Sequence, residues 1–297
     1  MAFHLRQACF LLLVALLSQH LTSGLAAANG RGDIGVYWGR NKYEGTLREA
    51  CDTGLYNTVM ISFLSAFGHG KYTLDLSDHS ESEYDIGIDI KHCQSKGILV
   101  LLSIGGQGGE YWLPSSKSAA DLADYLWTAF LGGGRAGVRL PFGDAAVDGV
   151  DFFIDQGATE HYDEVAKRLK DYTKYSRVGR AMVLAATTRC GFPDQRLEKA
   201  LDTGLFDRVH VKLFGEDRKC MSTPRESWEK WAAAYPRSKV FVVVVASPDT
   251  AAAPAGYLPP RDLYYRVLQF VMRRRNYGGI VIWNRYFDKK THFSSAL

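Results

Sequence analysis

Eight short apolar runs, separated by amphipathic stretches, constrain the fold of this 297-residue chain more than any other feature. Most of the runs are almost continuously apolar and rich in Val and Ile, which is typical of parallel strands buried on both faces. The predicted strands are Ile34–Gly39, Thr58–Leu64, Ile98–Ile104, Gly149–Asp155, Met182–Thr187, Val209–Phe214, Val240–Ala246 and Gly279–Trp283.

The stretches between these runs have helical spacing, most clearly at Ala119–Phe130, His161–Tyr172 and Leu263–Arg275. Eight strand–helix units over about 265 residues predict one α/β domain, a closed (β/α)8 TIM barrel. The alternative is an open, doubly wound sheet. No phosphate-binding GxGxxG or GxxxxGK[ST] motif follows the first run, so the sequence favours the barrel.

Residues 1–28 have the composition of a targeting segment. A basic start at His4 and Arg6 is followed by the apolar run Cys9–Leu17 and by small residues from Ser23 to Ala28. This order is typical of a secretory signal peptide, and the run is shorter than the about 20 residues that span a bilayer. We therefore expect a signal peptide at 1–28, the barrel at 29–297 and an extracellular protein.

Removal of this leader would remove Cys9 and leave Cys51, Cys93, Cys190 and Cys220. An even number of cysteines in a secreted chain favours disulfides. Three pairings are possible, and the order along the chain favours Cys51–Cys93 with Cys190–Cys220, each closing a local loop. No CxxC or HExxH motif is present, so we expect no metal and no cofactor.

Charge and hydropathy argue against two classes of partner. The formal net charge is +4, and acids and bases are interspersed without a long basic block. No run after the leader approaches the length of a membrane span. We therefore expect neither nucleic acid nor a membrane as a partner.

The fourth run carries the candidate site, because barrel enzymes place their chemistry at the carboxyl ends of strands. It reads Asp148-Gly-Val-Asp151-Phe-Phe153-Ile-Asp155, and alternation places Asp151, Phe153 and Asp155 on the inward face. Carboxylates inside a barrel need hydrogen bonds or a chemical role. A purely structural alternative is that Asp148 and Asp151 bind backbone amides.

This run resembles the D-G-x-D-x-D-x-E signature of glycoside hydrolase family 18, as do Ser103–Gly106 and the terminal Trp283 of the last run. The similarity extends along the whole chain after the leader, and the most similar branch is the plant class III chitinases. Within that branch, Trp38–Asn41, Ile88–Gly97 and Asn284–Lys289 resemble the cereal xylanase inhibitor proteins. The resemblance implies a TIM barrel in the plant apoplast, acting in defence as a monomer.

Three departures from the signature imply loss of chitinase activity. The general acid, a Glu in the family, is Asp155 here; the Asp that orients the substrate acetamido group is Phe153; and the Tyr that helps hold it is Phe214. Family 18 chemistry is substrate-assisted and depends on these groups. The resemblance therefore implies a vestigial site without a functional catalytic residue, at positions Asp148, Asp151, Phe153, Asp155, Phe214 and Trp283. A weak chitinase that uses Asp155 as its acid is the alternative.

Inhibition is the function that the resemblance implies instead. In the cereal inhibitors, an Arg on the loop between the fourth helix and the fifth strand blocks family 11 xylanases. The matching segment is Lys174–Arg180, with Arg177 at the inhibitory position. An Arg fork suits the paired carboxylates of a xylanase cleft. The implied partner is a microbial (fungal) family 11 xylanase.

Two further binding hypotheses follow from the same resemblance. The inhibitors contact family 10 xylanases through a Lys after the seventh strand, but the matching stretch Ser247–Gly256 has no Lys or Arg. Inhibition of family 10 enzymes is therefore not implied. A lectin-like alternative is that the remaining cleft, with Trp283 in its wall, binds a chitin-type oligosaccharide.

Overall fold

The fold below is that of residues 33–297, which form one compact unit in a computed structural model. The structure describes residues 30–297 except 78, 80, 135–136, 174–180, 216 and 251–255.

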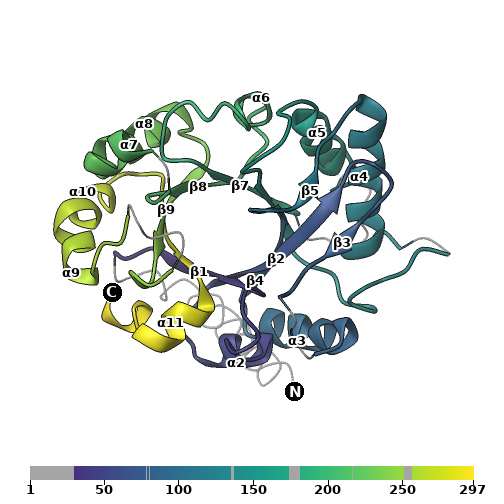
Figure 1. The fold of residues 1–297 in the computed structure, drawn as a ribbon, viewed down its shortest axis with the longest axis horizontal. Coiled ribbons are helices and arrows are strands. Elements are labelled where there is room, and N and C mark those ends of the chain that lie inside the picture. The colour runs from purple at the N-terminus through teal and green to yellow at the C-terminus, as the bar shows by residue number, and fades with distance from the viewer. Residues whose placement is uncertain are drawn as a thin grey trace, which may run out of the picture. The chain divides into compact units, whose positions relative to one another are not determined.

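The eight predicted strands form a closed ring of parallel strands (Figure 1). Their bounds are β1 Asp33–Trp38, β2 Thr58–Phe67, β4 Leu99–Gly105, β6 Gly149–Phe153, β7 Val183–Thr188, β8 Arg208–Lys212, β9 Lys239–Val245 and β10 Tyr277–Trp283. Neighbours in sequence pair in order around the ring, and β10 pairs with β1 to close it. The predicted TIM barrel is confirmed.

Two short strands extend the sheet at the carboxyl end of β2. The strand β3, Thr73–Leu74, pairs antiparallel with β2, and β5, Glu110–Tyr111, pairs parallel with it. The sequence did not predict them, because two residues are too few to show a period.

Helices surround the ring on its outside (Figure 1). The described helices are α2 Leu47–Asp52, α3 Glu83–Ser95, α4 Ser116–Phe130, α5 Tyr162–Thr173, α6 Glu198–Leu201, α7 Arg218–Ser222, α8 Pro224–Ala234, α9 Pro260–Leu263, α10 Gln269–Val271 and α11 Arg285–Thr291, with a π-helix η2 at Tyr264–Leu268 and a 3₁₀ turn η3 at Ser294–Ala296. Two predicted helices correspond to α4 and α5.

The third predicted helix, Leu263–Arg275, differs from the structure. It begins earlier, at Pro260, a residue preorganised for the first helical turn. It then passes through the wider η2 turn and ends at Val271. Beyond Val271 the helical hydrogen bonds are replaced by tighter turns, in which the amides of Arg273 and Arg274 donate to carbonyls three residues earlier in the chain.

Strand alternation separates two apolar layers, as expected for a barrel. In β6, Val150 and Phe152 pack outward against the helices, while Phe153 packs inside the ring with residues such as Tyr37 and Phe241. The register places Asp151 beside Ser103 of β4. Side chains from several strands therefore converge inside the barrel.

Both predicted disulfides are present. Cys51–Cys93 joins α2 to α3, with the two Cα atoms 5.5 Å apart. Cys190–Cys220 joins the segment after β7 to α7, with a Cα separation of 5.8 Å. In the chain-entropy model, loops of this size contribute about 4 kcal/mol each.

No helix in the described part of the chain is long and apolar enough to cross a membrane. Within the same residues, no group of His, Cys, Asp and Glu side chains is arranged to hold a metal ion.

Candidate functional site

Asp151 lies fully buried inside the barrel and is a structural residue by its contacts. Its carboxylate accepts hydrogen bonds from Ser103 Oγ at 2.7 Å and from Thr187 Oγ1 at 2.8 Å. Tyr37 donates to Thr187 at 2.6 Å, because the only hydroxyl proton of Thr187 is given to Asp151. Burial, and next the Asp151 charge, raise the pKa of Tyr37. The tyrosine therefore remains a proton donor.

Asp148 lies at the opposite end of β6 and binds backbone. Its Oδ2 accepts from the amide of Val100 at 2.9 Å, and its own amide donates to the carbonyl of Val100. The structural alternative for Asp148 therefore describes its position best. It is remote from the carboxyl ends of the strands.

Phe153, the last residue of β6, fills the mouth of the barrel, by which we mean the opening at the carboxyl ends of the strands. Its ring is 2% exposed and lies 5.1 Å from the ring of Phe63, 5.6 Å from that of Tyr37 and 5.7 Å from that of Trp283, measured between centroids. Lys212 Nζ lies over the same ring, 4.5 Å from its centroid. A phenyl ring at this place excludes both water and a polar substrate group.

Asp155 is held in an ion pair. Lys212 Nζ lies 2.6 Å from Asp155 Oδ1, and both side chains are less than one-tenth exposed. Arg189 adds a second cation, with Nε 3.7 Å from the same oxygen. Burial lowers the pKa of the Lys212 ammonium, and the carboxylate of Asp155 opposes this shift. The carboxylate is thus neutralised by charges that belong to the chain itself.

The backbone around Asp155 is fixed by β5. The Tyr111 hydroxyl accepts hydrogen bonds from the amides of Asp155, at 3.1 Å, and Gln156, at 3.2 Å. The same hydroxyl donates to the carbonyl of Gly106 at 2.6 Å. The short strand β5, which the sequence does not reveal, therefore sets the position of Asp155.

The remaining predicted positions complete the mouth. Phe214 is buried in the inner apolar layer with Phe153, and Trp283 packs at the edge of that layer, half-buried. Asp155 and Phe214 were placed inside predicted strands, but β6 ends at Phe153 and β8 ends at Lys212. Both residues lie two positions beyond a strand end, where barrel loops begin.

The comparisons with known proteins identify the family. The model of glycosyl hydrolases family 18 matches residues 33–247. The chain belongs to glycosyl hydrolase family 18.

Its relatives in the family include inhibitors and enzymes. Xylanase inhibitor protein 2 of Oryza sativa subsp. japonica is 60% identical over 262 residues, which cover 88% of each chain. An acidic endochitinase of Arabidopsis thaliana is 37% identical over 277 residues, which cover 90% of this chain and 89% of that one.

A solved structure of an inhibitor protein has a similar fold. The xylanase and alpha-amylase inhibitor protein of Scadoxus multiflorus matches with a TM-score of 0.82 and 35% identity, covering 89% of this chain and 97% of that chain.

Family 18 hydrolysis needs a proton donor and groups that hold the acetamido oxygen. In this member of family 18, Asp155 is paired with Lys212, and Phe153 and Phe214 contribute only phenyl rings to the inner apolar layer. The mouth therefore lacks the arrangement for substrate-assisted cleavage.

Sequence analysis missed Lys212 although a signal was present. Alternation along Val209–Phe214 turns His210, Lys212 and Phe214 inward, and a lysine at an inward barrel position requires a counter-charge. His210 is likewise fully buried, with Nδ1 3.4 Å from Asp151 Oδ1 and with no hydrogen bond to Nε2 in the described part of the chain.

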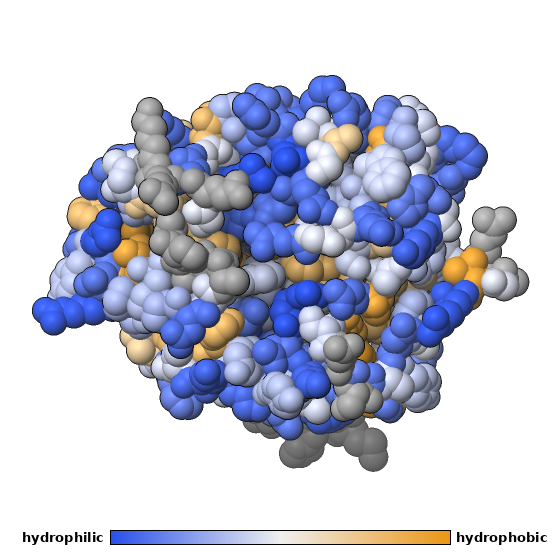
Figure 2. All heavy atoms as spheres, viewed as in Figure 1, coloured by the Kyte–Doolittle hydropathy of each residue, from blue (hydrophilic) through white to orange (hydrophobic). Residues whose placement is uncertain are grey.

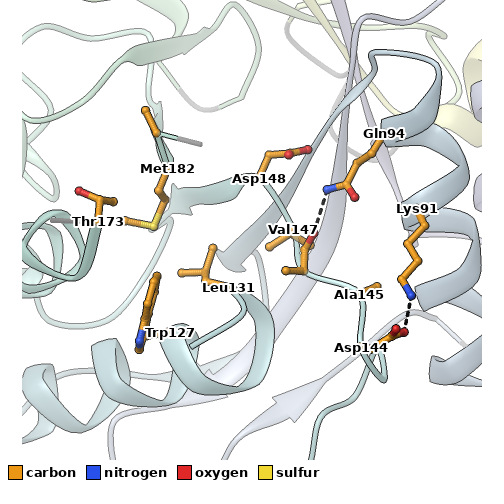
Figure 3. Close-up of a pocket in the computed structure, with 12 residues that line it drawn as sticks. Lys91, Gln94, Trp127, Leu131, Asp144, Ala145, Val147, Asp148, Thr173 and Met182 are labelled. Atoms are coloured by element: carbon orange, nitrogen blue, oxygen red, sulfur yellow. Dashed lines mark hydrogen bonds and ion pairs between the residues drawn. The ribbon is translucent and has the colours of Figure 1, made fainter. Parts of the chain in front are cut away.

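A cavity of about 200 Å³ lies on the face of the barrel opposite the mouth, beside the amino ends of β6 and β7 (Figure 3). Trp127, Leu131 and Met182 form its apolar wall, and Gln94 donates to the carbonyl of Ala146 at 2.8 Å at its other side. Lys91 and Asp144, which also line the cavity, form an ion pair on the same side as Gln94.

Thr173 and Ala181 also line this cavity. They flank the segment 174–180, and the predicted inhibitory Arg177 lies in that segment, outside the described residues.

Proposed function

We propose that this protein is a catalytically inactive member of family 18 that inhibits a microbial family 11 xylanase by placing Arg177 in the xylanase cleft. The observation that carries the proposal is the neutralised mouth. The Lys212–Asp155 pair and the buried Phe153 remove the family's own chemistry and leave binding as the role. The similarity to Xylanase inhibitor protein 2 supports the class of partner.

The described residues on both sides of segment 174–180 form a fixed stem. Lys170 of α5 donates to the carbonyl of Met182, just before β7, at 3.0 Å, and it pairs with Asp207 at 2.8 Å. One side chain thus ties the two ends of the segment together. A stem fixed before binding reduces the ordering cost of association.

The end of α5 is also anchored on α4. The Tyr172 ring stacks on Trp127, with the centroids 5.2 Å apart and the planes within 9°. Arg168 and Tyr172 both hydrogen-bond Asp124. These contacts fix the residues that precede segment 174–180, and an arginine inserted into a cleft requires such a rigid base.

The test is titration of the purified protein into a family 11 xylanase assay. Arg177→Ala is expected to raise the inhibition constant at least about 30-fold, or about 2 kcal/mol, because two desolvated carboxylates lose their cation. Arg177→Lys should recover only part of this, since an ammonium lacks the planar fork. Arg180→Ala, in the same segment, is the matched control and should retain inhibition. Equal inhibition by Arg177→Ala and the wild type would refute the loop assignment.

Location and assembly belong to the same proposal. We infer that residues 1–28 are a signal peptide and that the barrel acts as an apoplastic monomer. Two disulfides support an oxidising compartment. Mass spectrometry of the secreted protein should find the mature start near Asn29.

A chitin-type oligosaccharide is the secondary partner to test. Phe153 occupies the mouth, so binding of chitin oligomers there should be weak. Family 10 xylanases should be inhibited less than family 11 xylanases, because Ser247–Gly256 supplies no cation.

A further inference from the structure

The strongly basic stretch at residues 261–275 has no role in the proposed inhibition. Residues 261–275 contain five arginines and one aspartate, a net charge of +4, equal to the formal charge of the whole chain. This segment runs from α9 to the turn after α10. Figure 2 shows hydrophilic and hydrophobic residues intermixed at the left, where Figure 1 places these helices.

Two kinds of exposed side chain in this segment define what we call the basic aromatic face, and the segment's one acid, Asp262, is exposed as well. The arginines of the face are Arg266, Arg273 and Arg275, and its rings are Tyr264, Tyr265 and Phe270, all exposed. Among the described residues, no ion pair involves any of the three arginines. Three guanidinium groups thus remain available to a ligand.

Cations and rings are already in contact around this face. Arg225 of α8 lies over the Phe270 ring, 4.2 Å from its centroid, and Arg261 lies 6.0 Å from the centroid of Tyr265. The rings of Tyr264 and Tyr265 meet edge to face at 5.3 Å. Such contacts hold rings and guanidinium groups in place at an exposed surface.

We propose that the basic aromatic face binds an acidic polysaccharide, a chain of sugars that carry carboxylates. The guanidinium fork matches a carboxylate in a bidentate manner. Exposed tyrosines offer an apolar ring with a polar edge, which suits the two-sided character of a sugar ring. The choice of a polysaccharide over nucleic acid or lipid rests on the proposed secretion, since uronate carboxylates are anions of the extracellular matrix. The inference does not depend on xylanase inhibition.

The experiment measures binding of the full secreted protein to polygalacturonate and to the fully methyl-esterified polymer, which has the same backbone without charge. We expect tight binding to the first only, weakened by added salt because exposed charges are screened. The triple variant Arg266→Gln/Arg273→Gln/Arg275→Gln should bind at least about tenfold more weakly. Equal affinity for the two polymers would overturn the proposal.

A matched triple variant controls for net charge. Lys71→Gln/Lys117→Gln/Arg139→Gln removes three exposed cations, each paired with an acid. Lys117 lies on α4, across the ring from α9 and α10 (Figure 1), and the other two pair with Glu110 of β5 and Glu83 of α3. This variant should lose no more than about threefold in affinity, because only the long-range field changes. Equal losses in the two triple variants would show attraction by net charge alone and refute a site.

Two further measurements separate the alternatives. Tyr264→Ser/Tyr265→Ser should weaken binding about threefold without changing its salt dependence, because ring contacts carry no charge. Tighter binding to duplex DNA or to vesicles with phosphatidylserine than to polygalacturonate would refute the polysaccharide. Unchanged urea midpoints and unchanged inhibition of the family 11 xylanase by the arginine variant would show that the fold and the proposed function are intact.

Discussion

A cation lies over an aromatic ring both in the barrel mouth and at the basic aromatic face, but Lys212 of the mouth is buried whereas Arg261 beside the face is exposed. In the mouth, Lys212 covers Phe153 and pairs with Asp155 at 2.6 Å; Lys212 and Phe153 are buried, and the side chain of Asp155 is 9% exposed. On the face, Arg261 lies over Tyr265, and both are exposed. The same kind of cation–ring contact is therefore shielded from partners in the mouth and accessible to partners on the face.

The difference lies in what surrounds the cation. A buried lysine must have a counter-charge, because desolvation of an unpaired ion costs several kcal/mol. An exposed arginine has no such requirement, since water solvates it. Changes in the mouth should therefore affect stability, and changes on the face should affect binding.

The largest effect is expected from emptying the mouth. Phe153→Ala should lower the free energy of unfolding by about 4 kcal/mol, because it leaves a cavity among Tyr37, Phe63 and Trp283. Urea denaturation measures the change. Phe192→Ala, at a ring that is 40% exposed, is the control and should cost about 1 kcal/mol. Similar losses at the two positions would contradict a filled mouth.

Breaking the buried ion pair should have the next largest effect. Lys212→Ala should cost about 3 kcal/mol, because Asp155 keeps a buried charge with only Arg189 nearby. Adding Asp155→Asn should restore part of the loss in the double variant. Lys167→Ala, which removes an exposed helical pair with Asp163, should cost less than about 0.5 kcal/mol. A small effect at Lys212 would show that the pair is solvated.

The fold and the pairing of cysteines could be predicted because both depend on patterns that run along the chain. Eight apolar runs specify eight strands, and each strand begins within two residues of its predicted start. The inward direction of Asp151 and Phe153 followed from alternation in the same way. Local periodicity was sufficient for each of these.

The chemistry of the mouth could be predicted only in part, because it depends on residues brought together from different strands. The Lys212–Asp155 pair joins positions 57 residues apart, and Tyr111, which fixes Asp155, lies on a strand too short to show a period. Phe153 and Phe214 are visible in the sequence as apolar residues, whereas the partner of Lys212 is visible only in the fold.

The positive charge of Lys212 beside residue 155 adds a requirement for restoring catalysis. The triple change Phe153→Asp, Asp155→Glu and Phe214→Tyr supplies the missing family 18 groups but keeps Lys212 beside the new acid. We expect that adding Lys212→Gln raises hydrolysis of chitin oligomers at least about tenfold, or about 1.4 kcal/mol in the barrier. Release of reducing ends measures the rate, with the triple variant as the control. Equal rates would show that Lys212 does not inhibit the acid.

The smallest effect concerns Glu229, a carboxylate beside the basic aromatic face. A hydrogen bond from Arg274 at 2.7 Å, with the nearby charge of Arg225, holds the pKa of Glu229 below its ordinary 4.5. Because the pKa is lower in the folded state, the stabilisation is fully present above about pH 4.5 and is lost as the pH falls through the folded value. An exposed pair of this kind contributes less than about 1 kcal/mol.

The difference in unfolding free energy between the wild type and Glu229→Gln should therefore be larger at pH 7 than at pH 3. A difference for Glu229→Gln that stays constant or grows towards pH 3 would mean that Arg274 does not stabilise the folded state through this carboxylate. Arg274 would then count with Arg266, Arg273 and Arg275 as a cation available to an acidic ligand, and the triple arginine variant would have to be extended to include it.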